Sequence, residues 1–314
     1  MKPIPRVTLL IALTLICLES DITKADDLDS SVKSAIESAL PWLNEEGQWW
    51  IEDKECVSCH HSTFYVWANE LADSHGYTVD AALLKQDREW VVNQFIAARE
   101  PNPNVENDVV KEGEVKGDGN VEGIAQFLLS PASRHLDEAG HSELLGIIKS
   151  NRLDSGDWDP DGQLPRIKLP PEEIRVLSAL WSEIALGEMP GTIELKNPTS
   201  SEWFAMKLLA TKSEAALKAL LARQNTDGSW SWVDGESGSP TATGQALFAM
   251  SRSGPSGKSR EPMDQARQWL VTNQNEDGLW KTRSTKNREK SGRISNFWGT
   301  SWAVIGLLES EDVE

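Results

Sequence analysis

Apolar residues recur along this chain at helical spacing, and strand-like alternation is nearly absent. Residues 215–224 follow the helical period, and Asp227-Gly228 ends the pattern as a helix stop does. Residues 243–250 and 301–308 are rich in small and apolar side chains, which suits helices that are buried on most sides. The pattern predicts an all-α fold, in which pairs of helices are joined by glycine-containing loops.

Two further segments carry signals of helix starts. Pro170-Pro171 precedes two glutamates, and proline in the first turn with acids beside it favours the beginning of a helix. Thr199-x-x-Glu202 matches a capping box. We therefore expect helices to begin near residues 171 and 200.

A short pattern, Asn-x-acid-Gly-x-Trp, repeats along the chain. It occurs at residues 44–49, 225–230 and 275–280, and a weaker copy keeps Gly156 and Trp158. The last two tryptophans of the series, at 230 and 280, lie 50 residues apart. Repeats of this length indicate an array of helical units. The spacing predicts five units, one of them degenerate and placed between residues 88 and 126.

Residues 224–230 and 274–280, each running from a glutamine to a tryptophan, resemble the QW motifs of the squalene cyclase and protein prenyltransferase repeat superfamily. The resemblance covers most of residues 30–310. It implies an α/α toroid, in which about five helical hairpins alternate outer and inner helices around a central cavity. It also implies that four residues are structural, because the glutamine caps a helix and the tryptophan stacks on it: Gln224, Trp230, Gln274 and Trp280.

The sequence does not match the motifs that carry the reactions of that superfamily. The bacterial squalene cyclases use an Asp-x-Asp-Asp acid, and the nearest match, residues 157–161, has Pro160 between its last two acids. The zinc site of the prenyltransferases needs an Asp, a Cys and a distant His, and no such set is evident. Residues 157–162 also resemble the opening of a calcium loop, but Lys168 stands where a bidentate glutamate is required. A solvated turn explains the segment more simply.

The segment Cys56-Val57-Ser58-Cys59-His60-His61 carries the most specific chemical signal. A Cys-x-x-Cys-His spacing is typical of covalent c-type haem attachment, with the histidine as proximal iron ligand. We predict haem c bound by Cys56, Cys59 and His60. Two alternatives stay open, a zinc site formed with His60 or His61 and a plain disulfide.

Counting from the repeat tryptophans places this segment in a loop before an inner helix, expected at residues 63–72. Phe64, Tyr65 and Trp67 would then help to cover the haem. A standalone cytochrome c domain is not expected, because no methionine occurs between Met1 and Met189. His61 is excluded as sixth ligand, since adjacent side chains cannot reach opposite faces of one haem. An open site is one alternative, and the other candidate ligands are His75, His135, His141, Met206 and Met250.

The N-terminus predicts export. Lys2 and Arg6 precede an apolar run, residues 7–18, which suits a signal peptide and is too short to span a bilayer. Residues 23–25 form an acceptable cleavage site, and Ile16 before Cys17 disfavours lipidation. We therefore expect residues 1–25 to be a signal peptide, residues 26–314 to be the mature toroid, and the location to be periplasmic or extracellular. No membrane span is expected.

The net charge of the chain limits the classes of partner that we expect. The chain has 31 basic and 49 acidic residues, a formal net charge of −18, and a field of that sign repels nucleic acids. Neither a phosphate loop nor a Gly-x-Ser-x-Gly motif is present. The charged segment at residues 102–119 is expected to form a surface loop.

Three hypotheses follow. The first is an exported haem protein that serves electron transfer with a periplasmic redox partner or redox chemistry on a hydrophobic small molecule. The second is an exported toroid enzyme acting on an isoprenoid or glycan, with zinc as an alternative cofactor. The third is a scaffold that binds lipid or protein. An apolar pocket with a buried acid would favour the second, and a packed centre the third.

Overall fold

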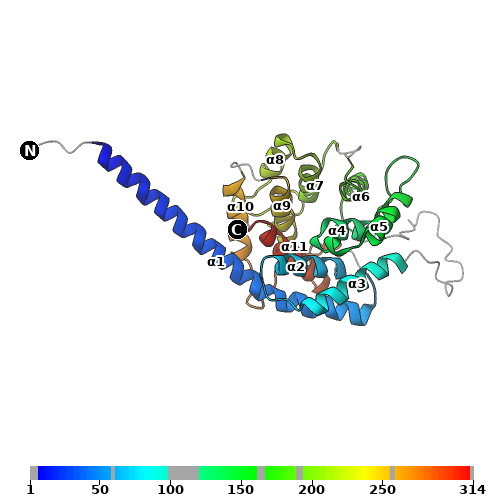
Figure 1. The fold of residues 1–314 in the computed structure, drawn as a ribbon. Coiled ribbons are helices and arrows are strands. Elements are labelled where there is room, and N and C mark those ends of the chain that lie inside the picture. The colour runs from blue at the N-terminus through cyan, green and yellow to red at the C-terminus, as the bar shows by residue number, and fades with distance from the viewer. Residues whose placement is uncertain are drawn as a thin grey trace, which may run out of the picture.

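The computed structural model describes residues 6–57, 61–97, 120–160, 167–188, 194–254 and 259–311, with side chains from residue 27 onward. In these ranges the secondary structure is helical apart from single-residue β-bridges, so the all-α prediction is confirmed. None of the helices within these ranges is long and apolar enough to cross a bilayer. The helices, shown in Figure 1, are α1 (Arg6–Lys54), α2 (Ser62–Ser74), α3 (Ala81–Ala97), α4 (Val121–Leu129), α5 (Glu138–Ser150), α6 (Pro171–Ala185), α7 (Ser201–Thr211), α8 (Glu214–Leu221), α9 (Pro240–Arg252), α10 (Arg260–Thr272) and α11 (Arg293–Glu309), with the 3₁₀ helix η1 at Pro131–His135.

Six helices form a continuous series of neighbours. In the order α2, α4, α6, α7, α9 and α11, each contacts the next, and α11 returns to α2. These helices are buried around much of their circumference, as expected for inner helices. The predicted inner helices at residues 63–72, 243–250 and 301–308 fall inside α2, α9 and α11. The order of contacts agrees with the alternation of inner and outer helices that the resemblance implies.

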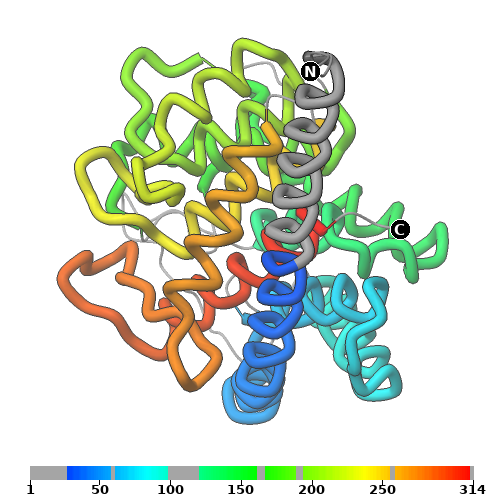
Figure 2. The backbone as a smooth tube through the Cα atoms, turned by 90° about the vertical axis from the view of Figure 1, so that its left-hand side faces the viewer, coloured from blue at the N-terminus to red at the C-terminus, as the bar shows by residue number. Residues whose placement is uncertain are grey.

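The other helices cover this series from outside. Each covering helix packs on the inner helix that directly precedes it in the chain: α3 on α2, α5 on α4, α8 on α7, and α10 on α9. Helix α1 packs on α11 and α10 in the same way, so the first helix covers the last repeat. Figure 2 shows α1 in blue beside the orange α10 and the red α11. The first helix and the last repeat are thereby in contact.

Glycine permits the closest of these contacts. A Cβ at Gly244 in α9 would lie 2.0 Å from the Trp302 carbonyl oxygen in α11. A Cβ at Gly306 in α11 would lie 2.6 Å from the Gly244 Cα. Real Cβ atoms do not approach backbone this closely, so any larger residue would force α9 and α11 apart.

The repeat tryptophans share one geometry. The indole N–H of Trp158, Trp230 and Trp280 donates to the carbonyl ten residues earlier, at 2.8, 2.9 and 2.8 Å. The glycine two residues before each tryptophan has a positive φ, +92°, +91° and +78°, which ends the preceding segment in a turn. The weaker copy at Gly156 and Trp158 is therefore a true member of the series.

The glutamines join neighbouring units. Gln224 Nε2 donates to the Gly228 and Pro262 carbonyls, at 2.9 and 2.8 Å. Gln274 Nε2 donates to the Gly278 carbonyl and to Ala35 in α1, both at 2.8 Å. The structural role that the resemblance implies for these residues agrees with their contacts.

Two expectations were wrong. Residues 44–49 form no turn, because α1 continues through them to Lys54. The capping box before α7 is also absent: Ser200 is the N-cap and accepts from the Trp203 amide, whereas the Glu202 carboxylate turns inward. The predicted start of α6 is confirmed, with Pro171 as its first residue.

Candidate functional site

The ends of the inner helices meet at one edge of the fold, here called the N-terminal rim: the first residues of α2, α4, α6, α7, α9 and α11 with the loops that lead into them. Asn120, which precedes α4, donates through Nδ2 to the Val57 carbonyl in the loop before α2, at 3.4 Å. Lys168 before α6 donates its amide to the Thr285 carbonyl before α11, at 2.9 Å. The loops of the rim are therefore in direct contact with one another.

Cys56 lies on this rim, in the short loop between α1 and α2. Its side chain is exposed, and it forms no disulfide with any cysteine whose side chain the structure describes. The Trp50 indole at the end of α1 donates to the Cys56 carbonyl at 2.9 Å, which fixes the start of the loop. Cys59 and His60 lie outside the described residues, so their positions relative to Cys56 stay a prediction.

His61, which directly follows the motif, is fully buried. Its ring stacks between Trp50, with centroids 4.0 Å apart, and Phe297 of α11, with centroids 4.2 Å apart. The sandwich joins α1, α2 and α11 below the loop. Both faces of its ring are covered, but a histidine binds a metal through a nitrogen in the ring plane, so the exclusion of His61 as sixth ligand stays a prediction.

The candidate sixth ligands with ionic partners lie far from the loop. His75 Nδ1 is 3.1 Å from Glu311, and His75 ends α2 about 20 Å along the helix from His61. His135 Nε2 is 3.0 Å from Glu70, which lies about 13 Å along α2. Met250 sits in the last turns of α9, away from the rim. The structure therefore brings neither histidine to Cys56.

The remaining candidates give no ligand at the rim either. His141 is exposed on α5, and Met206 is buried in the middle of α7. Within the described ranges no group of three or more His, Cys, Asp or Glu is placed to hold a metal ion. The zinc alternative involves Cys59 and His60 and therefore stays untested.

Five aromatic rings pack together inside the series of inner helices, and we call them the aromatic cluster. The Trp302 ring of α11 lies at its middle, with centroids 5.1 to 6.3 Å from the other four. All five side chains are buried, and four different helices supply them. Sequence analysis had placed two of them over a haem, but here they fill the interior. The members are Phe64, Trp67, Trp181, Phe248 and Trp302.

Glu202 of α7 touches this cluster. Its carboxylate accepts a hydrogen bond from the Trp181 indole at 3.1 Å. Burial raises the pKa of Glu202 to about 7, because the bond from Trp181 and the neighbouring Gln245 amide offset only part of the desolvation. A nearby negative charge on Glu173 adds to the increase. Glu202 can thus hold a proton near neutral pH in an aromatic environment.

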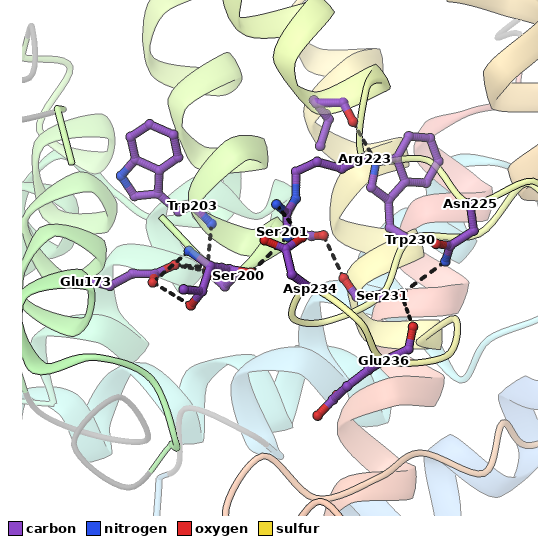
Figure 3. A network of polar contacts seen from close by, with 12 residues as sticks. Glu173, Ser200, Ser201, Trp203, Arg223, Asn225, Trp230, Ser231, Asp234 and Glu236 are labelled. Atoms are coloured by element: carbon purple, nitrogen blue, oxygen red, sulfur yellow. Dashed lines mark hydrogen bonds and ion pairs between the residues drawn. The ribbon is translucent and has the colours of Figure 1, made fainter. Parts of the chain in front are cut away.

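Glu173 is buried beside it but has many more donors. It accepts from the Thr199 amide and hydroxyl at 3.0 and 2.8 Å, and from the Ser200 amide and hydroxyl at 2.8 and 2.5 Å. Figure 3 shows Glu173 directed at Ser200 at the start of α7. Four donors at a helix N-terminus satisfy a carboxylate, so this residue fastens α6 to α7.

The same network holds the loop before α9. Ser201 Oγ donates to the Ser231 carbonyl at 2.6 Å, and Ser231 Oγ donates to the Glu236 carbonyl at 2.5 Å. Asn225 completes the chain by donating to Ser231 Oγ at 3.1 Å (Figure 3). This part of the N-terminal rim is rigidly built.

The acidic stretch at 157–161 carries no site in the described residues. Trp158 is buried as a repeat tryptophan, while Asp159 is exposed, and Asp161 lies outside the described ranges. The sequence does not mark Glu202 as an interior acid, because Thr199-x-x-Glu202 matches a helix capping box. A signal was available, since Glu202 is followed by Trp203 and Phe204 in an otherwise apolar segment.

No family model matches this sequence. A 74-residue segment is 38% identical to the drimenyl diphosphate synthase of Streptomyces showdoensis. That segment is 24% of this chain and 14% of the synthase, so the chain covers a small part of that protein. The match supports a partial relation to terpenoid cyclase-like proteins, in agreement with the QW-type turns.

Proposed function

We propose that this chain is an exported haem protein, in which Cys56 and Cys59 attach a c-type haem and His60 is the proximal ligand. Residues 1–25 direct its export, and residues 26–314 form the mature ring of helices. The observation that carries the proposal is the exposed side chain of Cys56 on a rim loop, within a Cys-x-x-Cys-His sequence. A thiol in that position is accessible for covalent attachment, as the chemistry requires.

The surrounding residues prepare the loop for this role. Trp50 and Asn120 hold the loop backbone through the carbonyls of Cys56 and Val57. His61 is held between two aromatic rings directly after the motif. A bound haem would supply one-electron redox chemistry, so the partner is a periplasmic redox protein or a hydrophobic small molecule.

The test is an absorption spectrum. The full chain is produced in a host that matures c-type cytochromes, and reduced-minus-oxidised spectra are recorded before and after denaturation. We expect a haem signal that survives denaturation, and its loss when Cys56 and Cys59 are both changed to alanine. His141→Ala, at an exposed surface position, is the matched control and should keep the signal. A colourless wild-type protein would refute haem attachment.

We propose isoprenoid chemistry as a second candidate function, because Glu202 has a raised pKa and lies in an aromatic environment. Such an acid could protonate an alkene. The partial match to drimenyl diphosphate synthase supports the same class of ligand. The close packing of the aromatic cluster counts against this second candidate, because its rings already fill the space between the helices.

This candidate is tested by incubating the protein with isoprenoid diphosphates of several chain lengths and analysing the extracts for cyclised products by mass spectrometry. Products should appear with the wild type and disappear with Glu202→Gln, which keeps the size of the side chain. Glu214→Gln, at the exposed start of α8, is the control. Absence of any product would leave the haem proposal unaffected and reject the second candidate.

A further inference from the structure

A second cavity lies on the N-terminal rim, apart from the Cys56 loop. It is enclosed by the loop before α9 and the loop before α11, and it has a volume of about 110 Å³. One water needs roughly 10–15 Å³ on the same measure, so the cavity has room for a group of several heavy atoms. Its lining is mainly hydroxyl-bearing and charged, with Trp232 as the aromatic wall.

Two buried donors in this lining are unsatisfied. The Thr241 hydroxyl and the Trp232 indole N–H have no hydrogen-bond partner among the described residues, although their side chains are only 2% and 4% exposed. Buried polar atoms nearly always have a partner, because leaving one unpaired costs about 1–3 kcal/mol. Two such donors in one small cavity point to a ligand that accepts hydrogen bonds.

The charge of the cavity is the reverse of that of the chain. Among the described residues, Lys281, Arg283 and Arg288 line it, against one acid, Glu236. The Arg288 guanidinium lies 5.2 Å from the centre of the Trp232 ring and donates to Glu236 at 3.2 Å, which keeps it in place. A local excess of two positive charges in a protein of net charge −18 favours an anion at this point.

Helix α9 adds to this field. It is 13 residues long and begins at Pro240 on the cavity wall. The N-terminal end of a helix carries a partial positive charge, which adds to that of the cations, although Pro240 has no amide hydrogen and the Ala242 amide already donates to the Ser239 hydroxyl. Together with the cations and the two unsatisfied donors, it makes the cavity suited to a tetrahedral oxyanion.

We propose that this cavity binds a phosphate-type oxyanion, either free phosphate or the phosphate or diphosphate group of a larger ligand. Arg283 and Lys281 approach it from the solvent side, and Thr241 and Trp232 donate from the buried side. The site is argued separately from the haem proposal, because none of the described residues of the Cys56 loop lines it.

The test is isothermal titration calorimetry of the full chain with three probes, pyrophosphate, orthophosphate and malonate. We expect pyrophosphate or orthophosphate to bind and malonate to bind at least tenfold more weakly. Stronger binding of pyrophosphate would identify a diphosphate-bearing ligand, and stronger binding of orthophosphate a single phosphate group. Binding of malonate alone, or of no probe, would overturn the proposal.

Three variants separate a built site from general charge attraction. Arg283→Gln should weaken phosphate binding about tenfold, since a charge-assisted contact is lost. Thr241→Val should weaken binding severalfold without lowering the melting temperature, because the hydroxyl that it removes has no partner in the protein. Lys85→Gln, on the exposed face of α3, should change nothing. An equal loss in the Lys85 variant, or no loss in the other two, would contradict the proposed site.

Discussion

At residues 275–280 the chain leaves α10 in a tight turn, whereas at residues 44–49 the same pattern of residues continues as helix. Gly278 has a φ of +78°, and a Cβ there would lie 2.0 Å from the Ser38 carbonyl oxygen of α1. Gly47 stays helical, and a Cβ there would instead meet the Tyr65 ring at 2.4 Å. The comparison shows that one motif can place its glycine for a turn or for close helix packing.

The tertiary contacts explain the difference. Gln48 donates to the Tyr65 hydroxyl at 2.9 Å and also bonds Asp87, so the first copy fastens α1 to α2 and α3. The Trp49 ring lies partly exposed under the Arg293 guanidinium, whereas Trp280 is fully buried. The last copy is thus a turn of the repeat, whereas the first is a helix surface that packs on α2, α3 and Arg293 of α11.

The glycines provide the strongest test of this comparison. Gly278→Ala should lower the free energy of unfolding by about 4 kcal/mol, because it adds both a strained φ and a backbone clash. Gly47→Ala should cost about 2 kcal/mol, since only the Tyr65 ring must move. Urea unfolding monitored by tryptophan fluorescence measures both. Gly156→Ala, with positive φ and open space around it, is the control and should cost about 1 kcal/mol. Equal losses at 278 and 47 would contradict the distinction.

The tryptophans give the next largest effect. Trp280→Phe should cost about 3 kcal/mol, because it leaves a space in the core and removes the bond to the Leu270 carbonyl. Trp49→Phe should cost less than about 1 kcal/mol, since its ring is partly exposed. Thermal melts followed by circular dichroism compare the two. A larger loss at Trp49 would show that the first copy is also a core element.

Two acids differ in a similar way, since Glu202 lies in the interior and Asp227 lies in a repeat turn. The pKa of Glu202 is raised to about 7, so the folded protein retains a proton that the unfolded chain loses above its usual value of 4.5. Stability should therefore fall by roughly 3 kcal/mol as the pH rises from 4.5 to 7, and then level off. Unfolding measured between pH 4.5 and 8 tests this, and Glu202→Gln should remove that part of the dependence.

Asp227, in the turn at residues 225–230, should behave in the opposite way. Its slight burial is outweighed by bonds from Ser229 and Trp269, so its pKa lies below the usual value of 3.8. Its contribution to stability is present above that value and is lost as the pH falls. Asp227→Asn should reduce the loss of stability in acid by a few tenths of a kcal/mol, since the residue is mostly exposed. No change below pH 4 would count against a structural role for this carboxylate.

The repeat glutamine gives a smaller expected effect than the repeat tryptophan. Gln274→Ala removes one hydrogen bond to Ala35 in α1 and one to Gly278 in its own turn, and should cost about 1–2 kcal/mol, whereas Gln268→Ala on the exposed side of α10 should cost almost nothing. Hydrogen exchange at the amides of α1 is the sharper measurement. Faster exchange there in the Gln274 variant alone would support a joining role for this residue.

Much of the fold could be predicted because it is local in the sequence. Helical periodicity located α8, α9 and α11, and the Gly-x-Trp pairs at 156, 228 and 278 marked the turns between units. The first copy could not be assigned, since its contacts with Tyr65 and Asp87 are set by tertiary packing. The candidate sites show the same difference between local sequence patterns and tertiary contacts. The motif at Cys56 is visible as a string of residues, whereas the environment of Glu202 and the cavity at Thr241 depend on side chains brought together from separate helices.

The covering of α11 by α1 has a consequence for the order of folding. Bonds such as that from Gln274 to Ala35 join residues 239 positions apart, so the ring cannot close until its last repeat is present. Contacts of such long range slow folding, because loop closure must precede their formation. Because the later part of α1 packs on α10 and α11, a circularly permuted chain in which a linker joins the end of α11 to Asp29, with new termini opened between α7 and α8, should reach the same structure by a different route, with α1 and α11 now formed as neighbours.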